Sequence, residues 1–103
     1  MPRVAIRLAE SALADLDSVR DWYVEQGVPD IGDRFLADIL QRVNTLRDHP
    51  ETGRIVPEFD QTTLRELIHR PFRIVYRLQK SRLYIVRVWR SERLLRLSGD
   101  EVD

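Results

Sequence analysis

The sequence predicts an α+β fold in which an N-terminal helical hairpin packs on one face of a mainly antiparallel sheet. Two changes in hydrophobic period support this prediction. Apolar residues alternate with polar ones at the start of the chain, then follow a helical period, and return to alternation from about residue 64. The predicted order of elements is β-αα-βββ, in a single domain that spans residues 1–103.

The first part of the chain predicts a short strand followed by a helix. Residues 4–8 alternate between apolar and other side chains, as in a strand with one apolar face. We expect Ser11 to be the helix N-cap, because its hydroxyl can accept a hydrogen bond from a first-turn amide. Gly27 favours a helix end, and Pro29 cannot continue the helix. The apolar face carries Ala12, Leu16, Val19 and Tyr23, flanked by Leu13 and Trp22.

A second helix is predicted to begin at Asp30 or Ile31. Because the connection QGVPD is short, the two helices should pack as an antiparallel hairpin. The following stretch, DHPETGRIVPEF, contains two prolines and one glycine and is expected to be a loop. The apolar stripe of the second helix consists of Leu36, Ile39, Val43 and Leu46, widened by Phe35 and Leu40.

Three further strands are expected in the last part of the chain. Both faces of the last strand are largely apolar, so we expect it to lie centrally in the sheet. Helices on one side alone leave the other face wet, and Arg73 and Arg77 are expected there. The segment SERLLRL from Ser91 is compatible with a short terminal helix. The strands are predicted at about 64–68, 72–78 and 83–90, joined by the turns HRP and QKS.

The formal net charge is zero, but the charges are unevenly distributed. Residues 1–64 carry seven arginines and twelve acidic residues. Residues 65–96 carry nine arginines and Lys80 against Glu66 and Glu92, which gives +8, and the tail 97–103 carries three acids. A positive pole of this kind indicates an anionic partner. The alternative is that the acidic helices pair with the basic sheet and neutralise it internally.

Several classes of function lack their sequence signals. With no cysteine, the chain has neither a disulfide nor a thiolate site. His49 and His69 stand in no metal-ligand spacing, and glycine-rich nucleotide loops are absent, so we expect no metal and no cofactor. Asp15 and Asp17 are expected on a solvated helix face. No secretory signal or apolar run of roughly 20 residues occurs, which predicts a soluble, cytoplasmic protein without a membrane partner.

Arginine is therefore the main candidate for function in the basic region. Guanidinium groups bind phosphates and carboxylates in a bidentate manner and stay charged at physiological pH. Tyr84 and Trp89 lie among these arginines and could stack on nucleic-acid bases. A position in the core is the stronger expectation for both rings.

The C-terminal segment LRELIHRPFRIVYRLQKSRLYIVRVWRSERLL resembles the sheet of the RelE/ParE superfamily of toxins from bacterial toxin–antitoxin modules. The stretches LAESALADLDSVRDWYVEQG and DRFLADILQRVNTLRDHPETGR resemble the two helices of that superfamily. The resemblance covers nearly the whole chain, and it implies the same β-αα-βββ order. It also implies a toxin that is neutralised by a cognate antitoxin.

Two mechanisms occur in this superfamily. RelE-like toxins cut mRNA on the ribosome, whereas ParE-like toxins bind and poison DNA gyrase without being enzymes. The strand before Arg73 has no lysine, and no tyrosine or histidine follows the last strand. RNA cleavage needs a base and an acid, which arginine supplies poorly. We therefore expect the ParE-like branch; the alternatives are a RelE-like ribosome-dependent mRNA endoribonuclease and a non-toxic relic that only binds antitoxin.

The resemblance also implies which residues and partners matter. The expected partners are a ParD-like antitoxin and DNA gyrase, with no direct sequence-specific DNA binding. We expect no catalytic residues; for a ribonuclease, the candidates would be Arg73, His69, Arg90 and Arg93. The residues expected to contact the partners are Arg70, Arg73, Arg87, Arg90 and Arg93.

Overall fold

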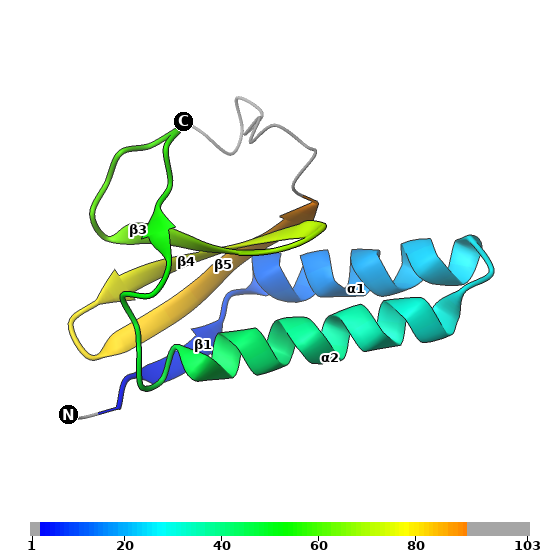
Figure 1. Cartoon of the computed structure of the whole chain (residues 1–103), viewed down its shortest axis with the longest axis horizontal. Helices are drawn as coiled ribbons and strands as arrows, with labels where there is room; N and C mark the ends of the chain where they lie inside the picture. Colours follow the sequence, from blue (N-terminus) through cyan, green and yellow to red (C-terminus); the bar gives the residue numbers. More distant parts are fainter. Residues whose placement is uncertain (1–2, 91–103) are drawn as a thin grey trace.

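The computed structural model describes residues 3–90, and within them two helices pack against one face of a five-stranded sheet (Figure 1). The strands lie in the order β1-β5-β4-β3-β2, with β1 parallel to β5 and the other neighbours antiparallel. The α+β prediction and the central place of the last strand are confirmed. The elements are β1 (Ala5–Leu8), α1 (Glu10–Glu25), α2 (Pro29–Thr45), β2 (Arg54–Ile55), β3 (Leu64–His69), β4 (Phe72–Gln79) and β5 (Arg82–Arg90).

Three expected boundaries are wrong. A short edge strand, β2, lies within the stretch that was expected to be a loop, and it pairs with β3. Helix α1 has Ala9 at its N-cap, while the Ser11 hydroxyl donates to the carbonyl of Val86 at 2.6 Å. Helix α2 begins at Pro29, because the fixed φ and missing N–H of proline suit a first helical turn. The terminal helix expected from Ser91 lies outside the described residues.

The main core lies between the helical hairpin and the sheet. Three residues of the apolar stripe predicted for the second helix, Ile39, Val43 and Leu46, are at most 5% exposed, and burial of each contributes about 1.5–3 kcal/mol. Phe35, which was expected to widen the second apolar stripe, packs against this core, whereas Leu13 (49%), Trp22 (45%) and Leu40 (47%) are about half exposed. In Figure 1 the hairpin projects beyond the sheet, so part of its surface has no strand to cover it. No helix in residues 3–90 is long and apolar enough to cross a membrane.

The sheet face opposite the helices is not uniformly wet. The connection between β2 and β3 covers the β3 side of this face, and Figure 1 shows it on the side away from the helices. A second core forms beneath this connection from Val56, Leu64 and Val75, with Phe59 packed against it. The expectation of an open, wet face is therefore wrong for this half of the sheet.

A bulge in β5 decides which side chains face the helices. Val75 lies opposite Arg87, whereas Tyr76 lies opposite Ile85, so Val86 is an extra residue in β5. Strict alternation would place Arg87 on the same face as Ile85. The bulge instead directs Val88 into the main core, and Arg90 lies opposite the core residue Phe72.

Candidate functional site

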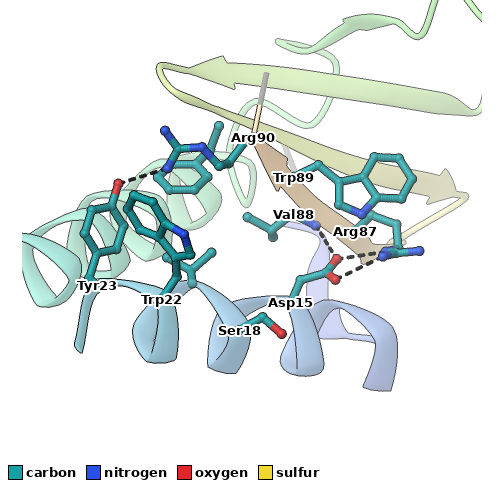
Figure 2. A pocket seen from close by; sticks show the side chains of 10 residues that line it. Asp15, Ser18, Trp22, Tyr23, Arg87, Val88, Trp89 and Arg90 are labelled. Carbon is teal, nitrogen blue, oxygen red and sulfur yellow. Dashed lines mark hydrogen bonds and ion pairs between the residues drawn. The ribbon is translucent and has the colours of Figure 1, made fainter. Parts of the chain in front are cut away.

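A groove of about 360 Å³ lies between α1 and the end of β5 (Figure 2). Asp15, Trp22 and Tyr23 come from α1, and Phe72 lies at the start of β4. The run from Arg87 to Arg90 forms the opposite wall. The site therefore joins residues that are about 70 positions apart in the chain.

The first half of α1 replaces a neighbouring strand along β5. Strand β1 pairs with β5 only as far as Ile85, and beyond it the backbone of β5 would be an open edge. There Ser11 donates to the carbonyl of Val86, and the Asp15 carboxylate accepts the Val88 amide hydrogen at 2.8 Å. Asp15 also binds Arg87 in a bidentate manner, with distances of 2.8 and 3.0 Å, as Figure 2 shows.

Aromatic rings hold the guanidinium groups of the groove. The Arg90 guanidinium lies 5.0 Å from the centre of the Trp22 ring and donates to the Tyr23 hydroxyl at 3.2 Å. The Arg87 guanidinium lies 4.2 Å from the centre of the Trp89 ring. Cation–π contacts of this kind contribute about 0.5–1 kcal/mol each at exposed sites. The groove thus presents flat rings and fixed positive charge next to an exposed tryptophan.

Arg73 does not lie on a wet surface, contrary to the sequence-based expectation. It is 7% exposed, and its guanidinium donates to both Glu58 oxygens at 3.0 and 3.1 Å and to Glu66 at 2.7 Å. Arg54 donates to Glu66 as well, at 2.7 Å. The hydrogen bond with Arg73 lowers the pKa of Glu58 against the opposing effect of burial. Burial would lower the pKa of Arg73, but the hydrogen bonds with Glu58 and Glu66 outweigh it and raise the pKa.

The residues predicted to contact partners do not form one surface. Arg87 and Arg90 line the groove, and Arg70 is exposed in the turn between β3 and β4. Arg73 belongs to the buried ion-pair network on the other side of the sheet. Arg93 lies outside the described residues. The roles of these arginines in binding stay predictions.

The residues proposed for the ribonuclease alternative are separated by the sheet. His69 and Arg90 both lie opposite Phe72, which belongs to the core on the helix side. Arg73 lies opposite Trp89 and points to the other side, because successive residues of a strand alternate. His69 instead has its Nε2 atom 3.8 Å from the Asp38 carboxylate.

The contribution of α1 to this site was not predicted from the sequence. Asp15 was expected on a solvated face, but its side chain is 14% exposed. Its partners on β5 depend on the bulge and on the early end of β1, neither of which has a clear signal in the sequence. Trp22, which was expected to flank the apolar face, lies at the rim of the groove with its ring edge-on to Tyr23. Tyr84 and Trp89 belong to neither core cluster, so the prediction that both rings lie in the core was wrong.

The chain matches a known protein family. Residues 6–95 match the family model described as the ParE toxin of type II toxin-antitoxin system, parDE. The chain is similar to one from the chromosomal ParDE TA system of P. aeruginosa, with a TM-score of 0.72 and 26% identity over 87% of this chain and 98% of that chain. It shares its fold with a chain of the toxin-antitoxin complex RelBE2 from Mycobacterium tuberculosis, with a TM-score of 0.64 and 17% identity over 85% and 98% of the respective chains. No curated protein matches the sequence.

Proposed function

Because the chain belongs to the ParE toxin family of type II toxin–antitoxin systems, we propose that it is a cytoplasmic toxin that binds and inhibits DNA gyrase. A ParD-like antitoxin neutralises it by binding. The protein acts through its surface and not as an enzyme. The ParDE system of P. aeruginosa, which contains a structurally similar chain, supports an antitoxin partner of this class.

The state of Arg73 is the observation that favours binding over RNA cleavage. Cleavage by a 2′-hydroxyl needs a base, an acid and a group that stabilises the developing charge. The Arg73 charge is already shared between two carboxylates, and its exchange for a phosphate would break both ion pairs. His69, the candidate base, lies on the other side of the sheet. These residues therefore support a structural role and not a reaction centre.

We propose that the groove between α1 and β5 is the surface that contacts gyrase or the antitoxin. Tryptophan, tyrosine and arginine are the residue types that dominate the binding energy of protein interfaces. In this groove the rings of Trp22, Tyr23 and Trp89 stand beside the guanidinium groups of Arg87 and Arg90. Such a surface suits a partner segment with an apolar anchor and acidic neighbours.

A gyrase supercoiling assay on the purified protein tests the proposed function. We expect loss of supercoiling that a ParD-like antitoxin reverses, and an SOS response when the toxin is expressed alone. Codon-specific cuts in translated mRNA, with supercoiling intact, would instead identify a ribonuclease. Harmless expression without the antitoxin would also contradict the proposal.

Substitution of Trp22 tests whether the groove makes the contact. We expect Trp22→Ala to weaken gyrase inhibition or antitoxin binding about tenfold or more, because loss of an interface tryptophan typically costs about 2 kcal/mol. Leu13→Ala is the matched control, since Leu13 is similarly exposed (49% against 45%) on the same helix but does not line the groove. Equal effects of the two substitutions, at equal melting temperature, would place the contact elsewhere.

A further inference from the structure

A second group of cationic side chains lies on the sheet face opposite the helices. Cross-strand register places Arg7, Tyr84 and Arg77 in one row across β1, β5 and β4. Arg82 lies two residues before Tyr84 on β5 and therefore shares its face. Tyr76 and Leu78, the neighbours of Arg77 in β4, pack in the main core, so the row faces away from the helices. We call Arg7, Arg77, Arg82 and Tyr84 the Tyr84 cluster.

The charges of this cluster are not compensated by the described part of the chain. Elsewhere in the sheet, Arg54, Arg73 and Arg87 bind carboxylates. Within residues 3–90, no ion pair reaches Arg7, Arg77, Arg82 or the adjacent Lys80. Within residues 3–90, the acidic residues thus neutralise one set of arginines and leave this corner positive.

A shallow hollow beside the cluster offers room for a ligand. Its volume is about 530 Å³, and it lies between the turn from β4 to β5 and the end of the segment that precedes β3. Lys80, Arg82 and Tyr84 contribute charge and an aromatic ring, and Thr63 and Gln79 contribute hydrogen-bonding groups. Its described lining contains no carboxylate. An anion therefore meets no like charge on this described lining.

We propose that the Tyr84 cluster binds single-stranded nucleic acid. Guanidinium forks match phosphate oxygens, and a partly exposed tyrosine can stack on an unpaired base, which a duplex does not offer. A protein partner is disfavoured, because an interface needs apolar anchors and the large exposed apolar side chains lie elsewhere. Those side chains belong to the helical hairpin: Leu13, Trp22, Val24, Val28, Ile31 and Leu40.

The chemistry of the cluster also predicts how selective the binding is. Phosphate contacts and stacking on ring faces read neither base edges nor the 2′-hydroxyl. We therefore expect dT20 and rU20 to bind with affinities within about threefold of each other. This activity goes beyond gyrase inhibition and uses residues that do not line the groove.

Fluorescence anisotropy with labelled dT20 and the full chain tests the proposal. We expect binding that weakens from 50 to 200 mM NaCl, because phosphate contacts release counterions. The double variant Arg77→Gln/Arg82→Gln should bind at least tenfold more weakly at 50 mM NaCl. Its slope of log K against log salt should be shallower by about 1.4, which is about 0.7 for each lost phosphate contact of a single strand. No wild-type binding at 50 mM NaCl would overturn the proposal.

Two controls separate the cluster from a general charge effect. Arg20→Gln/Arg34→Gln removes the same charge from exposed positions on the hairpin and should change dT20 affinity by less than about twofold. Tyr84→Phe should retain affinity and Tyr84→Leu should lose it, because only the former keeps a stacking ring. Equal weakening by both double variants, or binding of poly-glutamate and not of dT20 through the same residues, would overturn the proposal. Melting temperatures show whether each variant is folded.

The gyrase assay distinguishes a loss of nucleic-acid binding from a loss of gyrase inhibition. Neither Arg77 nor Arg82 lines the groove, so the Arg77→Gln/Arg82→Gln variant should inhibit supercoiling as the wild type does. Loss of dT20 binding with inhibition intact would confirm that the two surfaces act independently. Loss of both together would refute the separate role of the Tyr84 cluster.

Discussion

Arg73 and Arg77 lie on the same face of β4 but have opposite surroundings. Arg73 is enclosed beneath the segment that carries Glu58, and buried charge is tolerated there because two carboxylates satisfy it. Arg77 lies beyond that segment, in the row that contains Tyr84. One arginine therefore fastens a loop to the sheet, and the other is available to a ligand. The difference follows from Glu58 and Glu66, which bind Arg73, whereas no ion pair within residues 3–90 reaches Arg77.

The ion pair between Glu58 and Arg73 predicts a pH dependence of stability. Since the pKa of Glu58 is lower in the folded than in the unfolded chain, the pair stabilises the fold above the ordinary carboxyl pKa of about 4.3. This contribution is lost as the pH falls from there through the folded pKa. The difference in free energy of unfolding between wild type and Glu58→Gln should therefore shrink towards acid pH. Urea denaturation at pH 7, 4 and 3 measures it.

A matched substitution shows whether this pH effect belongs to the pair. Glu25→Gln removes an exposed carboxylate at the end of α1 that forms no ion pair within the described residues. Its difference from the wild type should stay nearly constant over the same pH range. A constant difference for Glu58→Gln as well would mean that the ion pair does not stabilise the fold.

At the scale of elements, the close approach of α1 and α2 depends on Gly32. A Cβ atom at this position would lie 2.7 Å from the Cβ of Tyr23, so the helices would have to move apart. We expect Gly32→Ala to lower the free energy of unfolding by about 1–3 kcal/mol despite the better helix propensity of alanine. Asp33→Ala is the control, because its side chain is exposed on the same helix. Urea denaturation of the two variants measures the difference. Equal stability would show that the helices move apart without a loss in the free energy of unfolding.

The elements differ in how far the sequence predicts them. Long periodic stretches were predicted well, because the burial of Ile39, Val43 and Leu46 reflects one regular helical stripe. The two-residue strand β2 was missed, since it is held by pairing to β3 and has no period of its own. The bulge at Val86 was also missed, and this single extra residue reverses the direction of every side chain after it. The groove depends on that reversal, so its composition could not be predicted from alternation.

At the scale of the whole molecule, α1 lies near the start of the described chain and packs against its last strand. Asp15 contacts Arg87 and Val88, which are 72 and 73 residues away in sequence. These contacts close the open part of the β5 edge and fix α1 against the last strand. The same contacts shape the groove. Asp15 therefore contributes both to stability and to the proposed partner surface. The residues of the Tyr84 cluster do not line that groove, and none of them is among the partners of Asp15 on β5.

This shared role predicts a graded response to substitution of Asp15. Asp15→Ala leaves the Val88 amide without its acceptor and removes a charge partner of Arg87, so we expect a loss of about 2–4 kcal/mol in the free energy of unfolding. Asp15→Asn should lose less, because its amide oxygen can still accept from Val88. Asp17→Ala is the control, since its side chain is 72% exposed on the same helix and it gains the same helix propensity. Urea denaturation at pH 7 ranks the three variants. Similar stability of Asp15→Ala and Asp17→Ala would show that the contacts of Asp15 with β5 do not stabilise the fold.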